Sequence, residues 1–195
     1  MNVAEILFAQ QGFEAVSIRE LAKVADINIA MISYYFGSKE KLYEEIVLRK
    51  LTSTEKMKSI IEQHNTYTDK LFAISDLYVD VFIENRNFHN IIFREMAMEQ
   101  RTMMNAVITE NLYKNFTLLS DIIRKGIKAG EFKKNIDIEL VATTVIAVNK
   151  LFSTSPIVIC KILNVDESEF TYGEKHKKRL KKYLHNLLTS YLAIP

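Results

Sequence analysis

Residues that reverse a chain sharply are scarce in this sequence, and this limits the folds it can adopt. The 195 residues include only 5 Gly and 2 Pro, whereas the turns of a multi-stranded sheet depend on these residue types. Apolar residues recur at three- and four-residue spacing through most segments, which is the period of an amphipathic helix. The sequence therefore predicts an all-α fold of about nine helices.

The first two helices are predicted from their end signals. The segment Asn2–Gln11 carries apolar residues at helical spacing and is followed by Gly12, which favours a helix end. Ser17 is a good N-cap, and Glu20 three residues later completes a capping box. We expect a second helix of about eight residues to start there.

The next helices follow from the same kinds of signal. Asn28 is expected to cap a third helix that ends at Gly37, and Ser38 to cap a long fourth helix that continues to about His64. Further helices are predicted over residues 69–84, 88–98, 103–129, 137–152 and 174–192, with a short apolar piece over 157–163.

Composition limits the functional classes. The apolar content of 48% is typical of a packed globular protein, and the net charge of +2 neither requires nor excludes a polyanionic partner. The single cysteine, Cys160, has no partner for a disulfide and no neighbours for a zinc site. The sequence shows no signal peptide and no membrane span, so we expect a cytoplasmic protein.

Residues 17–36 are expected to form a helix-turn-helix, because two short helices are joined by a corner of about three residues. Such a motif lays its second helix in a major groove about 12 Å wide. On a helical wheel, Ile32 and Phe36 point toward the core. The outward face then consists of Ala30, Ser33 and Tyr34, flanked by Ile29, Met31 and Tyr35.

Each residue type on that outward face suits one kind of DNA contact. Its two small residues let the backbone approach base edges, and the flanking apolar residues suit thymine methyl groups. The two tyrosine hydroxyls reach phosphates and position the helix. Lys39 adds an ammonium to the free N–H groups at the start of the fourth helix, and Ser17 and Arg19 open the second helix in the same way.

The same stretch resembles a known family. Residues 7–42 read LFAQQGFEAVSIRELAKVADINIAMISYYFGSKEKL, which is similar to the pattern LFAxxGFxxxSIRxIAxxAGVxxxxIYYYFxSKExL of the TetR/AcrR family of bacterial transcriptional regulators. The resemblance implies that Arg19 contacts a base or phosphate, that residues 29, 30, 31 and 33 face bases, and that Lys39 and the tyrosines hold the DNA backbone. The predicted DNA-binding residues are Ser17, Arg19, Asn28, Ile29, Ala30, Met31, Ser33, Tyr34, Tyr35 and Lys39.

Three features depart from the family pattern. The sequence begins at Met1, without the basic residues that usually precede the first helix, so this arm is either absent or was cut off by the chosen start codon. Residues 1–58 contain 8 Lys and Arg against 8 Asp and Glu, a net charge of zero. Ser33 stands where the family often has Tyr, and the third helix carries no Lys or Arg for a guanine contact. These features predict a low baseline affinity for DNA.

More ordinary interpretations stand beside these roles. Tyr34 and Tyr35 are alternatively half-buried packing residues, and Lys39 and Arg19 solvated charges. The methionine-rich stretch from Phe93 to residue 104 suits an adaptable ligand pocket or ordinary core filling. The basic run near residue 178 is interpreted as the solvated face of the last helix.

The resemblance also implies an organisation for the whole chain. We expect a DNA-binding domain over residues 1–45 and a helical effector-binding and dimerisation domain over 46–195, with no cofactor and no metal. Predicted effector contacts are Phe72, Tyr78, Phe82, Phe93, Met96 and Phe116. The predicted interface of a homodimer, a four-helix bundle, comprises Val141, Val145, Val148, Phe152, Leu184, Leu187, Leu188 and Tyr191.

The functional prediction is a ligand-responsive regulator, expected to be a repressor, that binds a palindromic operator as a homodimer and is released by a small molecule. A carrier or interaction module without DNA binding is the alternative. It is favoured by the missing basic residues before the first helix and by the zero net charge of residues 1–58. The sequence contains no paired carboxylates, activated nucleophile or phosphate-binding glycine loop, so an enzyme is not expected.

Overall fold

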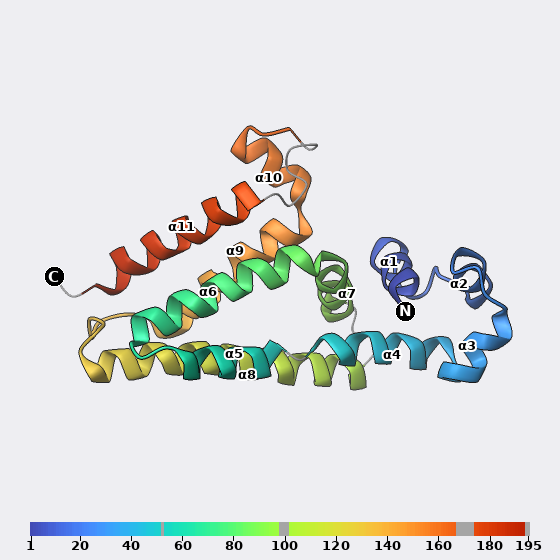
Figure 1. Cartoon of the computed structure of the whole chain (residues 1–195), viewed down its shortest axis with the longest axis horizontal. Coiled ribbons are helices and arrows are strands. Elements are labelled where there is room, and N and C mark those ends of the chain that lie inside the picture. Colours follow the sequence, from blue (N-terminus) through green and yellow to red (C-terminus); the bar gives the residue numbers. More distant parts are fainter. Residues whose placement is uncertain (52, 98–101, 167–173, 194–195) are drawn as a thin grey trace. The chain divides into compact units, whose positions relative to one another are not determined.

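The computed structural model describes residues 1–51, 53–97, 102–166 and 174–193. These ranges contain eleven helices and no strand, so the all-α prediction is confirmed (Figure 1). The chain forms two compact units, residues 1–52 with 87–111, and residues 53–86 with 112–195. The expected functional division between residues 45 and 46 is a separate matter and stays a prediction.

The first unit holds the predicted helix-turn-helix. It comprises α1 (Asn2–Gln11), α2 (Ile18–Val24), α3 (Ile29–Phe36), α4 (Lys39–Lys50), most of α7 (Arg86–Ala97) and the first turns of α8 (Thr102–Ala129). Phe8, 1% exposed, and Tyr43, 4% exposed, pack edge to face with ring centroids 5.2 Å apart. The Tyr43 hydroxyl donates to Glu95 Oε2 at 2.7 Å, which ties α4 to α7 inside this core.

The predicted caps are present at both ends of the motif. Ser17 Oγ accepts from the Glu20 amide at 3.1 Å, and Ser38 Oγ accepts from the Lys41 amide at 3.2 Å. The Glu20 carboxylate accepts from the Gln11 side chain at 2.8 Å, so it ties α2 to α1 in place of the reciprocal half of the capping box. Local sequence thus fixes where α2 and α4 begin.

The predicted fourth helix is wrong in length. It was expected to reach about His64, but α4 ends at Lys50 and a separate helix, α5 (Ser53–Gln63), follows. Only Leu51 and Thr52 lie between the two helices, and the sequence TSTEK over residues 52–56 has no apolar residue and three hydroxyl residues of weak helix propensity. Apolar residues resume at helical spacing from Met57, which is why the period alone predicted one helix.

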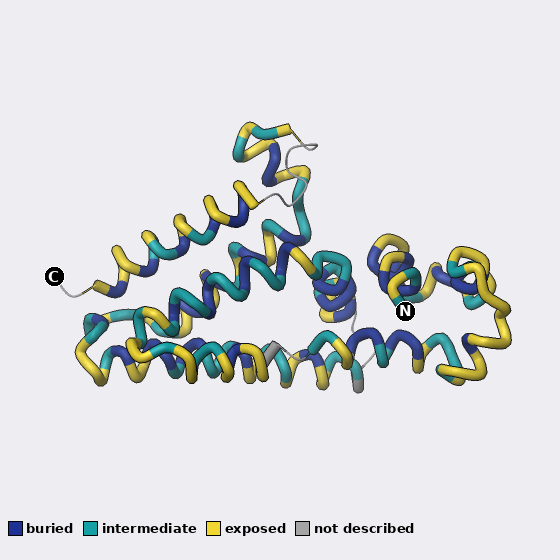
Figure 2. Tube along the Cα trace, in the orientation of Figure 1, coloured by how far each residue is buried: buried dark blue, intermediate teal, exposed yellow. Residues whose placement is uncertain are grey.

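The second unit is built around α6. Its helices are α5, α6 (Tyr67–Glu84), the remainder of α8, α9 (Ile138–Thr154), α10 (Pro156–Leu163) and α11 (Glu174–Leu192). Within this unit α6 packs against α9, α11 and α5. Val79 and Ile83 of α6 form a buried cluster with Leu180 and Leu184 of α11, and the burial pattern in Figure 2 follows these facing sides.

A polar ladder joins α6 to α11 beside that cluster. Lys177 donates to Glu84 at 2.7 Å, and His185 Nε2 lies 2.8 Å from Asp76. Between them Lys181 donates to Asp80 at 2.8 Å. The pairing 177 with 84 and 185 with 76 shows that the two helices run antiparallel.

The break between α9 and α10 lies where proline predicted it. Ser155 is non-helical, with φ −131° and ψ 55°, and Pro156 occupies the first turn of α10. The apolar piece over residues 157–163 is therefore a helix in its own right. Across the described residues no single helix is long and apolar enough to cross a membrane; α9 and α10 pass that test only as a pair bent by 101°.

Candidate nucleic-acid interface

The turn between α2 and α3 begins with the C-terminal end of α2, which contains a residue in the left-handed backbone conformation. The Asp26 amide bonds to Lys23 O at 3.3 Å and the Ile27 amide to Ala22 O at 3.0 Å, the two bonds of a Schellman motif. Asp26 has φ 52°, a conformation that favours glycine. The family pattern has Gly at this position, so the chain keeps the corner at some conformational cost.

The outward face of α3 is open, as a DNA-reading surface requires (Figure 2). Tyr34 is 81% exposed and Tyr35 66% exposed, with their rings edge to face at 5.1 Å. Ile29 and Met31 are 43% and 41% exposed, whereas Ile32 on the opposite side is 3% exposed. The alternative interpretation of the tyrosines as packing residues is wrong, because neither ring is half buried.

Two predicted contact residues, Ser17 and Asn28, are exposed at helix starts and are already used as caps. Asn28 Oδ1 accepts from the Ala30 amide at 2.9 Å, and Ser17 Oγ caps α2. Their remaining hydrogen-bonding groups, the amide NH₂ and the hydroxyl proton, are still open to a partner. Arg19 and Ser33 are exposed as well.

Lys39 has an internal role that the sequence did not reveal. Its ammonium donates to Phe13 O at 2.9 Å and to Val16 O at 3.0 Å, and it lies 4.0 Å from the centroid of the Phe13 ring. The side chain therefore anchors the loop between α1 and α2 to the start of α4. One of its three protons is left for a phosphate, so its predicted DNA contact stays a prediction.

Within residues 1–51, the Lys and Arg side chains that are not bound to other groups of the protein lie on α2. Of the six Lys and Arg in residues 1–51, Lys39 is bound to the loop and three others are in ion pairs with carboxylates. Arg19 and Lys23 are the two left, both exposed and four residues apart on one face. Sequence analysis missed Lys23, although its spacing from Arg19 was the signal.

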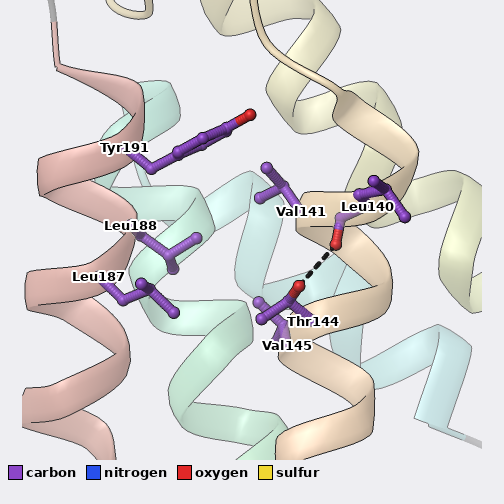
Figure 3. Close-up of a pocket in the computed structure, with 7 residues that line it drawn as sticks. All are labelled: Leu140, Val141, Thr144, Val145, Leu187, Leu188 and Tyr191. Atoms are coloured by element: carbon purple, nitrogen blue, oxygen red, sulfur yellow. Dashed lines mark hydrogen bonds between the residues drawn. The ribbon is translucent and has the colours of Figure 1, made fainter.

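A second surface feature lies in the other unit, between α9 and α11. A groove of about 240 Å³ is lined by Leu140, Val141, Thr144, Val145, Leu187, Leu188 and Tyr191 (Figure 3). A second groove of about 290 Å³ is lined by Val148, Phe152, Leu163, His176, Arg179, Leu180 and Tyr183. Seven of the eight predicted interface residues line these two grooves.

The eighth predicted interface residue is part of the core. Leu184 is 0% exposed and packs against Val79 and Ile83 of α6. The sequence missed Leu140, 63% exposed, and Tyr183, 56% exposed, which line the grooves and have more apolar surface to offer. Apolar spacing locates the stripe on each helix but does not say which side a neighbouring helix covers.

The predicted effector residues do not all fall in one unit. Phe72, Tyr78, Phe82 and Phe116 belong to the second unit, whereas Phe93 and Met96 belong to the first. The Phe72 ring stacks on His185 at 4.2 Å, Tyr78 and Phe82 are buried, and Met96 is 44% exposed. The Met98 and Met103 side chains lie outside the described residues. The set stays a prediction.

In the described ranges, no group of three or more His, Cys, Asp and Glu has the arrangement of a metal site.

Comparison with known proteins gives the interface its context. Residues 1–46 match the family described as bacterial regulatory proteins, tetR family, and residues 48–154 match the YsiA-like protein, C-terminal region. The chain belongs to the tetR family. The open face of α3 thus lies in the segment that matches the tetR family, and the family consists of transcriptional regulators rather than enzymes.

Several relatives of the tetR family are similar over most of the chain. The probable transcriptional regulator YttP of Bacillus subtilis is 31% identical over 133 residues, which cover 66% of this chain and 63% of YttP. The repressor KstR2 of Mycolicibacterium smegmatis is 26% identical over 72% of this chain and 69% of its own length.

Solved structures agree in fold. The ketosteroid transcriptional regulator KstR2 of Mycobacterium tuberculosis has a TM-score of 0.77 at 16% identity, covering 100% of this chain and 93% of that one. FadR of Bacillus subtilis, in complex with stearoyl-CoA, has a TM-score of 0.70 at 19% identity, covering 97% and 95%.

Proposed function

We propose that this protein is a transcriptional repressor that binds operator DNA through α3 and is released by a small apolar effector. The open face of α3, with two phenol groups at its far end, is the observation that carries the proposal. Small residues face the bases, the tyrosine hydroxyls bind phosphates, and Arg19 and Lys23 add the charge that α3 itself lacks.

The operator is proposed to be palindromic because the protein is proposed to act as a homodimer. The grooves between α9 and α11 expose apolar side chains that an identical surface on a second copy would cover, as in a two-fold interface. Two recognition helices related by that symmetry read half-sites about 34–36 Å apart, or a multiple of this.

The effector is proposed to be largely apolar. KstR2 of Mycobacterium tuberculosis is described as a ketosteroid regulator, and FadR of Bacillus subtilis was solved with stearoyl-CoA. Both names point to molecules with a long or broad hydrocarbon body. The second unit of this chain has a buried apolar interior with which such a body is compatible. Release from DNA then follows if the effector binds one arrangement of the protein more tightly than the other.

The test begins with selection of random duplexes by the purified full-length protein. A palindrome should be enriched, and Tyr34→Phe and Tyr35→Phe should each weaken binding of the dimer roughly tenfold to a hundredfold by removing one phosphate hydrogen bond in each subunit. Tyr113→Phe is the matched control, since Tyr113 is 65% exposed on α8. Equal binding of all three variants and wild type would refute the role of α3.

Salt dependence separates charged from neutral contacts. With Arg19 and Lys23 from each of two subunits, log K against log salt should have a slope of about −4. Arg19→Gln should reduce that slope by about two in the dimer, whereas Tyr34→Phe should leave it unchanged. A flat response would show that phosphate neutralisation does not contribute.

A carrier without DNA binding is the second candidate. It is favoured by the small number of free cations in the head, where four of six are bound to other groups of the protein. Failure to enrich any duplex, together with retained binding of apolar molecules, would support it.

A further inference from the structure

The two helices that pack together in the α6–α9 seam carry three buried oxygens without a hydrogen-bond partner among the described residues. Ser75 of α6 and Asn149 and Ser153 of α9 are all 0% exposed. Ser75 Oγ, Asn149 Oδ1 and Ser153 Oγ have no hydrogen-bond partner among the described residues. A buried oxygen left in this state costs about 1–3 kcal/mol, so three of them on one pair of packed helices call for a function.

The three groups lie along one stretch of the seam. Val148 and Phe152 of α9 pack against the cluster that contains Val79 and Ile83 of α6, and Figure 1 shows the two helices running in the same direction. Asn149 and Ser153 are one turn apart on α9, and Ser75 lies one turn before Val79 on α6. At 1.5 Å per residue the row spans roughly 12 Å, about the length of a small organic molecule.

The neighbouring polar groups are neutral too. The Tyr78 hydroxyl, one turn from Ser75, donates only to Met57 Sδ at 3.7 Å, a weak acceptor. Burial raises the pKa of Tyr78, so its phenol stays protonated. Lys177, a buried cation of this unit, already donates to Glu84 at 2.7 Å. None of the three oxygens is bonded to a cation among the described residues, and a buried charge without a partner is costly, so a carboxylate beside them would be disfavoured.

From these observations we propose that the α6–α9 seam is the recognition site for the polar part of the effector, and that this part is an uncharged hydroxyl or carbonyl group on an apolar body. The inference rests on the proposed function and names the chemical class of its effector. The hydroxyls of Ser75 and Ser153 donate to a carbonyl or accept from an alcohol, and Asn149 Oδ1 accepts from an alcohol. Entry of the molecule parts α6 from α9, which supplies a structural change for release from DNA.

The test uses the full-length protein and four probes that share one chain length: dodecanol, methyl dodecanoate, sodium dodecanoate and dodecane. Calorimetric titration at pH 8 keeps the dodecanoate ionised. The alcohol and the ester should bind at least about tenfold more tightly than the carboxylate, because only the carboxylate carries a charge into the seam. Equal or tighter binding of dodecanoate would overturn the proposal.

Two alanine variants assign the binding to the seam. At least one of Ser75→Ala and Ser153→Ala should weaken dodecanol binding about threefold to tenfold and leave dodecane binding unchanged, because one hydroxyl reaches only one end of a row roughly 12 Å long. Without any probe, each should raise the melting temperature by about 2 °C, because an unsatisfied buried oxygen is removed. Ser190→Ala, at an exposed position on α11, is the matched control and should change neither quantity.

A higher melting temperature together with weaker dodecanol binding in an alanine variant distinguishes a ligand site from a structural one. If the oxygens hold buried water or fix the helix register, the alanine variants will leave probe affinity unchanged, and the proposal fails. Operator binding of the same variants, measured without probe, is expected to match wild type. A protein that binds dodecanol through the seam but no DNA would refute the proposed repressor while leaving this inference intact.

Discussion

At the scale of single residues, the ends of α2 and α8 use the same motif with different residues. The ending of α8 places Gly130 at φ 78°, with the Glu131 amide bonded to Gly126 O at 2.9 Å. The ending of α2 places Asp26 at φ 52° in the equivalent position. A residue with a Cβ is strained there and glycine is not.

Asp26→Gly should therefore stabilise the protein by about 1 kcal/mol. Asp26→Asn is the control, since Asn tolerates the left-handed conformation as Asp does but has no charge. Urea unfolding measures both changes. A gain in Asp26→Asn equal to that in Asp26→Gly would show that charge, not backbone strain, is the cause.

Lys39 gives a second prediction, in which stability is separated from DNA contact. Lys39→Gln removes an ammonium that bonds two carbonyls of the α1–α2 loop, and should lower the free energy of unfolding by about 2 kcal/mol. Lys41→Gln should cost less than about 0.5 kcal/mol, because Lys41 is in an exposed ion pair with Glu44. If Lys39→Gln is as stable as wild type yet loses operator binding, its contribution is a phosphate contact instead.

At the scale of helices, the start of α6 is held by a residue far away in sequence. The Glu131 carboxylate accepts from the Tyr67 amide at 3.0 Å and the Thr68 amide at 2.9 Å. Burial raises the pKa of Glu131, but these hydrogen bonds outweigh it, so the net pKa lies below the ordinary value. Because the pKa is depressed in the folded state, the ionised carboxylate stabilises the fold at any pH above the pKa of the unfolded chain, which is near 4.3. This stabilisation is lost as the pH falls through the lower pKa of the folded state.

Glu131→Gln should thus cost about 1 kcal/mol at pH 7, and the difference from wild type should shrink once the pH falls below about 4. Thermal unfolding over a range of pH measures it. Glu62→Gln, at an exposed position on α5, should show no such dependence. A penalty that is constant with pH would mean that Glu131 acts by packing rather than by charge.

Local sequence predicts helix starts better than it predicts helix packing. Ser17, Asn28 and Ser38 were identified because a cap and the amide it binds lie within three residues. The hydrogen bonds that Glu131 and Lys39 make to the backbone were not identified, because their partners are 64 and 26 residues away in the sequence. Contacts over such distances produce no periodic pattern in the sequence.

At the scale of the whole molecule, the grooves of α9 and α11 predict how assembly and DNA binding depend on one another. Leu140→Glu places a charge on the lining of the first groove, and should shift the protein toward monomer in sedimentation equilibrium. Operator affinity should fall at least about tenfold, because two heads joined in one dimer bind a palindrome more tightly than separate heads. Thr143→Glu, exposed on α9 but outside the groove lining, is the control. A monomeric variant with unchanged operator affinity would contradict the dimer.

The exposed face of α3, which is proposed to bind DNA, could be located from sequence almost completely, and the rest of the site only in outline. Residues 28–36 are contiguous, so a helical wheel separates Ile32 from Tyr34 without further information. The α6–α9 seam joins Ser75 to Ser153 across 78 positions, and a buried serine looks like any other serine until its neighbours are known.

The hydrogen bond from Tyr43 to Glu95 also bears on how this regulator can be engineered. A fragment that stops after α4 would keep the reading helix but leave the Tyr43 hydroxyl without its carboxylate partner and one side of α4 without the residues of α7. Grafting the amino-terminal helices onto a different sensor should accordingly give a poorly folded chimera, unless the exchange carries residues 87–97 along with them.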